Sequence, residues 1–146
     1  MAKMIKGMIL EHVNMYVKDR DASIDFYTKA MGFKLLRKYE TDTQRVAYLY
    51  LDDQLLELNE NFNQDQPLGL SHLGFRVDDL DQAMTELKKQ NVEYVMGPFN
   101  IQPKIYATTN VLDEKLKRAL KPINKPYWRE AIFRDPNGVT LELIER

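Results

Sequence analysis

Residues 10–22, LEHVNMYVKDRDA, and residues 70–83, LSHLGFRVDDLDQA, decide the fold because they are two copies of one pattern. Identical residues recur in five pairs at an offset of 60 positions: Leu10/Leu70, His12/His72, Val17/Val77, Asp19/Asp79 and Asp21/Asp81. The protein has only 2 histidines, and both occupy the same place in the pattern. Chance is a poor explanation for that coincidence, so the sequence predicts two modules that share one fold.

Each copy opens with apolar and more polar residues in alternation. In the first copy the apolar residues Val13, Met15 and Val17 alternate with the more polar residues His12, Asn14 and Tyr16. Leu73, Phe75 and Val77 alternate in the same way in the second copy. A period of two predicts a half-buried strand, with the apolar series on the core and each histidine on the opposite face.

A helix is expected after each strand. Asp21 and Asp81 are expected to begin the helices by accepting hydrogen bonds from free backbone amides, and Gly32 is expected to end the first helix. The second helix is expected to end near Asn91. The predicted buried positions are Ile24, Tyr27 and Met31 in the first helix and Met84 and Leu87 in the second.

Two hairpins complete the modules. The predicted strand pairs are Arg45–Leu51 with Leu55–Asn59, turned at Asp52–Asp53, and Trp128–Arg134 with Val139–Ile144, turned at residues 135–138. The fold class is therefore α+β, with paired βαβββ modules whose sheets lie edge to edge and enclose a cavity. We expect a single domain over residues 1–146, with module 1 at about 8–62 and module 2 at about 68–146. An insertion at about 100–127 interrupts module 2.

Two glutamates repeat along with the histidines. Glu142 is an acid in an otherwise apolar strand, between Leu141 and Leu143, and its counterpart Glu57 lies between two leucines in the same alternation. Two imidazoles and two carboxylates make a ligand set for one divalent metal, and Ni²⁺, Zn²⁺, Co²⁺, Mn²⁺ or Fe²⁺ would accept it. A strand histidine or glutamate alone more often has no such role, but the symmetry of the four favours the metal site.

Composition narrows the function classes. The 146 residues are 44% apolar and 29% charged, which is typical of globular proteins, and the absence of cysteine excludes thiol catalysis and iron–sulfur clusters. A net charge of −1 gives no reason to expect nucleic acid as a partner. The sequence shows neither a membrane span nor a secretion signal, so we expect a cytoplasmic protein.

The stretches LEHVNMYVKDRDASIDFYTKAMGF, LSHLGFRVDDLDQA and FRDPNGVTLELIE together resemble the vicinal oxygen chelate superfamily. The resemblance runs from His12 to Glu145. It implies paired βαβββ modules forming an open barrel, as the repeat already suggests. In small members of the superfamily, modules from two chains often complete each site, so the resemblance also implies a homodimer.

Among the members, glyoxalase I is the nearest match. Its His, Glu, His, Glu metal set corresponds to His12, Glu57, His72 and Glu142. The resemblance implies isomerisation of a hemithioacetal of a 2-oxoaldehyde to a 2-hydroxyacyl thioester, with Glu142 moving the proton and Glu57 as its partner. The substrate would then be a small molecule such as a thiol adduct.

Two positions bear on which thiol is used. Asn61 matches an asparagine that glyoxalase I carries four residues past its first glutamate, so it is a candidate substrate-binding residue. Tyr16 stands where the family tends to carry a basic residue, four past the first histidine. That departure leaves open which thiol forms the substrate.

Other members remain alternatives. Extradiol dioxygenases bind iron through two histidines and one glutamate, but they need a further histidine that this chain lacks. Epimerases generally carry glutamine where Glu57 stands, and fosfomycin-type transferases use three protein ligands. A non-catalytic antibiotic-binding protein would enclose an aromatic pocket, for which the candidates are Tyr16, Tyr48, Tyr50 and Trp128.

The insertion is basic. Residues 100–129 carry seven basic and two acidic side chains, a net charge of +5. Leu112, Leu116 and Leu120 predict a helix with one apolar edge, closed by Pro122. Two interpretations stay open: a lid that draws an anionic substrate toward the metal, and a solvated amphipathic helix packed over the sheet, which is slightly favoured.

Overall fold

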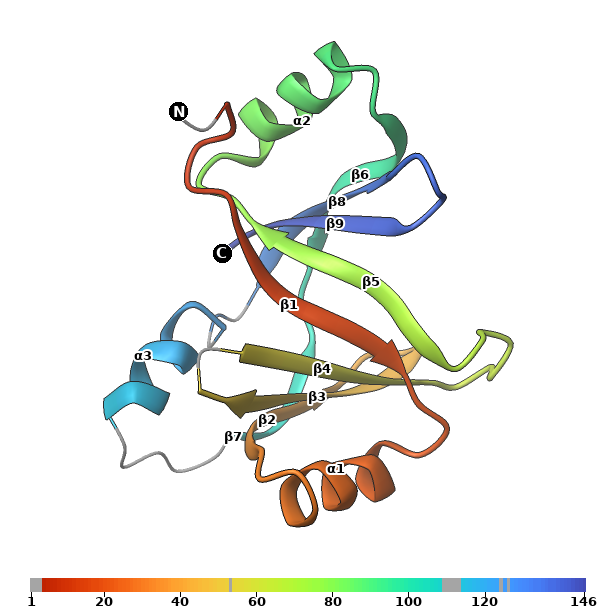
Figure 1. The fold of residues 1–146 in the computed structure, drawn as a ribbon, viewed down its shortest axis with the longest axis vertical. Helices are drawn as coiled ribbons and strands as arrows, with labels where there is room; N and C mark the ends of the chain where they lie inside the picture. The colour runs from red at the N-terminus through yellow and green to blue at the C-terminus, as the bar shows by residue number, and fades with distance from the viewer. Residues whose placement is uncertain (1–3, 53, 109–113, 124, 126) are drawn as a thin grey trace. The chain divides into compact units, whose positions relative to one another are not determined.

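The structure is a computed structural model that describes residues 4–52, 54–108, 114–123, 125 and 127–146. In chain order its elements are β1 (Ile9–Tyr16), α1 (Arg20–Lys29), β2 (Lys34–Glu40), β3 (Gln44–Leu51), β4 (Gln54–Asn61), β5 (Gly69–Arg76), α2 (Leu80–Lys89), β6 (Glu93–Ile101), β7 (Lys104–Thr108), α3 (Glu114–Ile123), β8 (Trp128–Arg134) and β9 (Thr140–Glu145) (Figure 1). The order βαβββ occurs twice, with β7 and α3 inserted in the second copy. The predicted α+β fold of paired modules is confirmed.

The chain divides into two compact units. Unit 1 comprises Met1–Glu11, His72–Gln102 and Lys125–Arg146, and unit 2 comprises His12–Ser71 and Pro103–Asn124. The strands of unit 1 lie in the order β6-β8-β9-β5, and those of unit 2 in the order β1-β4-β3-β2-β7. Helix α2 packs against the sheet of unit 1, and helix α1 packs against the sheet of unit 2.

The same strand pairing recurs in both units, which confirms the repeat. β1 runs parallel to β4 with Asn14 opposite Glu57, and β5 runs parallel to β9 with Gly74 opposite Glu142. Both hairpins also form, β3 with β4 and β8 with β9. Equivalent residues of the two copies therefore occupy equivalent places in the two sheets.

The helices begin two residues earlier than predicted. Asp19 and Asp79 are the N-caps, and their carboxylates accept hydrogen bonds from Ala22 N at 2.9 Å and Gln82 N at 3.0 Å. Asp21 and Asp81 lie within the first turns instead. Each copy has two aspartates two residues apart, and the first of each pair has the extended backbone that a cap requires.

The apolar faces of the two sheets pack against their helices. In unit 2 the core contains Ile24, Ala47, Leu49 and Leu58, with Tyr27 partly buried against it. In unit 1 it contains Leu80, Met84, Phe133 and Leu143, with Leu87 and Leu141 packed on it. The predicted burial of Met31 was wrong: α1 ends at Lys29, and Met31 is 53% exposed.

Part of the insertion belongs to the sheet of unit 2. β7 pairs antiparallel with β2, with Arg37 opposite Thr108 and Glu40 opposite Lys104. The sequence pattern does not predict this strand. The expected helix is α3, which runs one residue past Pro122 to Ile123. Leu112 and the side chains of Leu116 and Leu120 lie outside the described residues.

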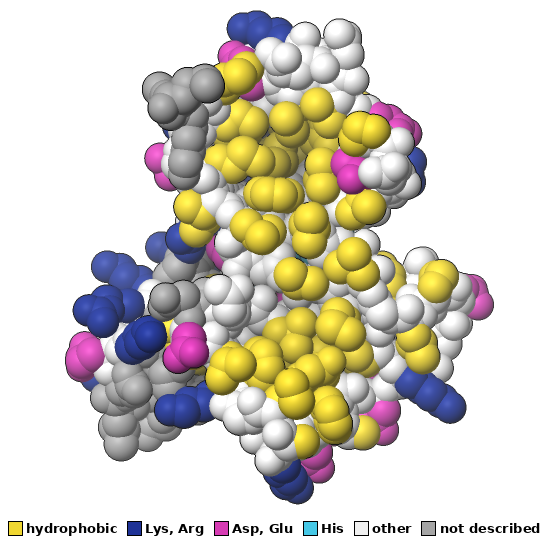
Figure 2. Space-filling model, in the orientation of Figure 1, with side chains coloured by type: hydrophobic (Ala, Val, Ile, Leu, Met, Phe, Trp, Pro, Cys, Tyr) yellow, Lys and Arg dark blue, Asp and Glu magenta, His cyan; other side chains and the backbone are white. Residues whose placement is uncertain are grey.

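The end of α3 is anchored on the sheet. Ile123 is fully buried, and its carbonyl oxygen accepts a hydrogen bond from Nη1 of Arg37, which is also fully buried. Arg37 pairs with Tyr48 across the sheet, so this anchor lies on the face that also carries Tyr48. Basic side chains gather over α3 (Figure 2), and those of Lys115, Lys117, Arg118 and Lys121 are exposed. The packed-helix interpretation agrees with this arrangement.

Candidate functional site

In unit 2, His12 and Glu57 form a buried pair. The face of β4 opposite Glu57 carries Leu58, which packs into the core, so the alternation of the strand turns Glu57 to the other face. His12 lies on the neighbouring strand β1. Its Nε2 is 3.5 Å from Glu57 Oε2, and the two side chains are 0% and 7% exposed.

Two further side chains hold this pair. Asn14 is fully buried, and its Nδ2 donates a hydrogen bond of 2.5 Å to Glu57 Oε1. The Tyr48 ring meets the His12 ring edge to face, with centroids 6.1 Å apart. Because one carboxylate oxygen accepts from Asn14 and the other faces His12, the orientation of Glu57 is set by its neighbours.

In unit 1, His72 and Glu142 form the equivalent pair. Leu141 and Leu143 of β9 pack on the core and turn Glu142 to the opposite face. His72 Nε2 is 3.2 Å from Glu142 Oε2, and the side chains are 12% and 10% exposed. The residue equivalent to Asn14 is Gly74, which has no side chain to donate to Glu142. The two carboxylates therefore differ in their support.

Each pair has the geometry of two ligands on one metal ion. Zn–N and Zn–O bonds of about 2.0–2.2 Å at angles of 90–110° put the two donor atoms about 3.0–3.5 Å apart. The observed separations of 3.5 Å and 3.2 Å fall in or at the edge of this range. Imidazole nitrogen and carboxylate oxygen are the donors that such ions bind, so the residues fit a divalent metal.

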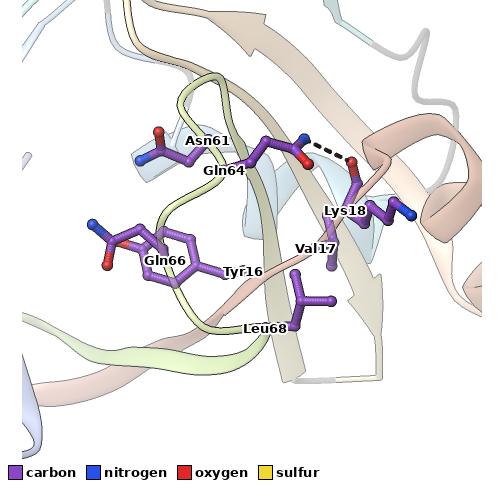
Figure 3. A pocket seen from close by; sticks show the side chains of 7 residues that line it. All are labelled: Tyr16, Val17, Lys18, Asn61, Gln64, Gln66 and Leu68. Atoms are coloured by element: carbon purple, nitrogen blue, oxygen red, sulfur yellow. Dashed lines mark hydrogen bonds between the residues drawn. The ribbon is translucent and has the colours of Figure 1, made fainter.

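Tyr16 and Asn61 line a small pocket in unit 2. They share it with Val17, Lys18, Gln64, Gln66 and Leu68, and its empty volume is about 240 Å³ (Figure 3). Gln64 Nε2 donates to the carbonyl oxygen of Lys18 at 3.3 Å. In Figure 3 the Lys18 ammonium points away from the side chains of Tyr16, Asn61 and Gln66. The pocket therefore presents amides and a phenol rather than a charge.

Trp128 lies in unit 1 and is only 4% exposed. Its indole Nε1 donates to Glu130 Oε2 at 3.0 Å, and the Arg146 guanidinium lies over its ring at 5.2 Å. Tyr48 and Tyr50, the other aromatic candidates, are 1% and 7% exposed on β3 of unit 2. Of the aromatic candidates, Tyr16 is the one that lines a described pocket.

A charged cluster of unit 1 was not predicted. Glu11 is buried, and its carboxylate faces Arg76 Nη1 at 3.5 Å and, more closely, Arg146 Nη2. The sequence does hold one signal for it, since Arg76 stands 60 positions after Tyr16. Asn14 was missed as well, because an amide in a strand shows no pattern of its own.

Arg129, near the end of the insertion, has a structural role in unit 1. Its Nη2 donates to Asp81 Oδ1 at 3.0 Å, and its Nη1 is 3.6 Å from Glu145 Oε1. The hydrogen bond to Asp81, together with the charges of Asp81 and Glu145, raises the pKa of Arg129 above its ordinary value. Arg129 therefore remains a cation that links β8 to the first turn of α2.

The family follows from the match of residues 9–101 to the model described as "Glyoxalase/Bleomycin resistance protein/Dioxygenase superfamily". The chain belongs to this superfamily. The matched region covers well over half of the chain and includes His12, Glu57 and His72. The resemblance stated from the sequence motifs is confirmed.

Relatives within the superfamily include bacterial and plant proteins. A lactoylglutathione lyase of Escherichia coli O157:H7 is 28% identical over 94% of this chain and 93% of its own length. A lactoylglutathione lyase of Neisseria meningitidis serogroup A is 27% identical over 95% and 91%. A probable chloroplastic lactoylglutathione lyase of Arabidopsis thaliana is 27% identical, and the match covers only 35% of its length.

Solved structures with low sequence identity share the fold. Methylmalonyl-CoA epimerase from Mycobacterium tuberculosis is similar with a TM-score of 0.69 and 23% identity, covering 99% of this chain and 91% of that one. A hypothetical protein from Bacillus halodurans C-125 is similar with a TM-score of 0.72 and 18% identity, covering 97% of this chain and 96% of that one.

Among the described residues, no helix combines the length and the apolar character needed to cross a membrane.

Proposed function

We propose that His12, Glu57, His72 and Glu142 bind one divalent metal, and that the site isomerises a hemithioacetal of a 2-oxoaldehyde to a 2-hydroxyacyl thioester. The observation that carries the proposal is the duplicated histidine–glutamate pair, with N···O separations of 3.5 Å and 3.2 Å. The lactoylglutathione lyases among the relatives, at 27–28% identity over almost the whole chain, support this reaction.

The metal, when bound, supplies positive charge that offsets the negative charge developing on two adjacent substrate oxygens. Glu142 removes the proton from the carbon that bears the sulfur and returns it to the neighbouring carbon. The hydroxyl proton of the hemithioacetal passes to the former carbonyl oxygen, so the product has the same atoms as the substrate. A base for this step must be able to move, and it must stay within reach of both carbons.

The support of the two carboxylates favours Glu142 as the base. Asn14 fixes one oxygen of Glu57, whereas Gly74 gives Glu142 no equivalent donor. The neighbouring strand therefore supplies an amide donor to Glu57, whereas the equivalent position supplies none to Glu142, so we assign the proton transfer to Glu142. Glu57 would remain as a fixed ligand beside His12, and Asn61 and Tyr16 would contact the thiol part of the substrate.

Epimerisation is the second candidate, because a structure of methylmalonyl-CoA epimerase covers 99% of this chain with a TM-score of 0.69. That reaction also moves a proton at a carbon next to a carbonyl group, so the same carboxylates would act. Glu57 favours the isomerase, since the superfamily's epimerases generally carry glutamine there. A solvent-deuterium exchange assay on a 2-substituted malonyl thioester would detect the epimerase activity.

The Glu142→Gln variant tests the assignment of the base. With metal-loaded protein, methylglyoxal and a panel of thiols, we expect thioester formation by the wild type and a rate lower by about 10²–10⁴-fold in the variant. The metal content should fall by less, because three ligands remain. A variant with metal bound and an unchanged rate would assign the proton transfer elsewhere, and a wild type inactive with every thiol would contradict the isomerase.

A further inference from the structure

The repeat relates Tyr16 to Arg76 and Asn61 to Arg146. Tyr16 and Arg76 lie four residues past His12 and His72, and Asn61 and Arg146 lie four past Glu57 and Glu142. The strand registers are equivalent, with Asn14 opposite Glu57 and Gly74 opposite Glu142. The same positions of the two modules therefore carry neutral side chains in unit 2 and guanidinium groups in unit 1.

In unit 2 these positions are occupied by the neutral side chains of Tyr16 and Asn61, which line the pocket described above. Gln64 and Gln66 complete its polar lining, and the Lys18 ammonium is directed away from it. Amides and a phenol can donate and accept hydrogen bonds, but they supply no full charge. An anionic group gains less there than beside a guanidinium.

In unit 1 the equivalent residues, Arg76 and Arg146, both face the carboxylate of Glu11. Its carboxylate engages Arg146 most closely, and the Arg146 side chain is 0% exposed and lies over the Trp128 ring. Arg76 Nη1 is 3.5 Å from the same carboxylate, but the Arg76 side chain is 27% exposed. Glu11 carries one negative charge and faces two guanidinium groups. Because Arg76 is the more exposed of the two arginines, it is the one that can bind another anion.

Arg76 also lies on the appropriate face of the sheet. His72, Gly74 and Arg76 alternate onto one face of β5, and four residues along a strand span roughly 13 Å. A substrate that reaches the metal near His72 could therefore extend along β5 to Arg76. Such a span excludes a two-carbon thiol and suits a long one with a charged tail.

We propose that Arg76 binds a carboxylate or phosphate on the tail of the thiol, so that the anion-binding end of the site lies in the second module rather than beside Tyr16. This inference rests on the proposed function for the identity of the substrate as a thiol adduct. The planar guanidinium can bind either anion through two parallel hydrogen bonds, while Arg146 pairs with the Glu11 carboxylate that Arg76 also faces.

Calorimetric titration of the wild type with matched ligands tests the inference and distinguishes the two anions. The carboxylate arm compares S-methylglutathione with its diethyl ester, and the phosphate arm compares acetyl-coenzyme A with S-acetylpantetheine. In one arm, we expect the ligand that carries the anionic groups to bind roughly ten- to a hundredfold more tightly than the analogue that lacks them. In Arg76→Gln the ratio should fall to near one.

Two control variants make the outcome specific. Arg134→Gln removes an exposed arginine of the same unit and should leave the ratio unchanged. Arg76→Lys keeps the charge without the paired donors and should keep part of the ratio, which also covers the case that Arg76→Gln does not fold. An unchanged ratio in the folded Arg76 variants, or no preference for either anion in the wild type, would overturn the inference. Anion preference without any isomerase activity would refute the proposed reaction and leave the anion site standing.

Discussion

At the scale of single residues, the two halves of the site are alike in their ligands and unlike in what surrounds the ligands. The histidine and the glutamate repeat, but Asn14 in one copy is Gly74 in the other, and Tyr16 is Arg76. Duplication explains the symmetry of the four proposed metal ligands. The difference between Asn14 and Gly74 gives Glu57 a fixed orientation. The difference between Tyr16 and Arg76 places the positive charge in the second copy.

Asn14 provides a prediction at this scale. In Asn14→Ala the Glu57 carboxylate loses a buried donor, so we expect metal affinity to fall and the free energy of unfolding of the metal-free protein to drop by about 1–3 kcal/mol. Metal titration and urea unfolding measure the two effects. Asn100→Ala removes an exposed amide and serves as the control. Wild-type affinity in a folded Asn14→Ala would show that Asn14 does not orient Glu57.

At the scale of elements, alternation and repetition were enough to predict most strands. The two hairpins and both leading strands occur within a few residues of their predicted places, because each has a long polar–apolar alternation. β7 could not be predicted in this way. It has only five residues, and its partner β2 lies more than 60 positions earlier, so nothing local in the sequence indicates the pairing.

The residues of the candidate site also differ in whether the sequence reveals them. His12, Glu57, His72 and Glu142 could be named from the sequence because duplication marks them, and the structure brings each histidine to its glutamate. The Glu11 cluster could not be named from the sequence, because its three members are far apart along the chain and only the fold brings their charged groups together. Trp128 could be named as aromatic, but its burial beneath Arg146 depends on that packing.

The helix caps give a prediction for elements. Asp19→Ala and Asp79→Ala each remove the acceptor for a free amide of the first turn, so each should lower the free energy of unfolding by about 1 kcal/mol. Asp42→Ala is the control, since Asp42 is an exposed aspartate between β2 and β3 and belongs to no helix. Equal losses in Asp19→Ala and Asp42→Ala would contradict the assignment of the cap.

At the scale of the whole molecule, the repeat raises the question of how many chains make one site. We propose a homodimer, because small members of the superfamily often complete each site with modules from two chains. Light scattering at micromolar concentration should then give about twice the 17.2 kDa mass of one chain. A monomer that keeps its metal would contradict this prediction.

We propose that one metal ion draws its ligands from both copies of the repeat. Equilibrium dialysis against Zn²⁺ or Ni²⁺ tests this proposal directly, with His12→Ala changing unit 2 and His72→Ala changing unit 1. We expect one ion per chain in the wild type and a large loss of affinity in each variant alone. A wild type that binds no metal would contradict it, as would two ions per chain of which each variant loses one.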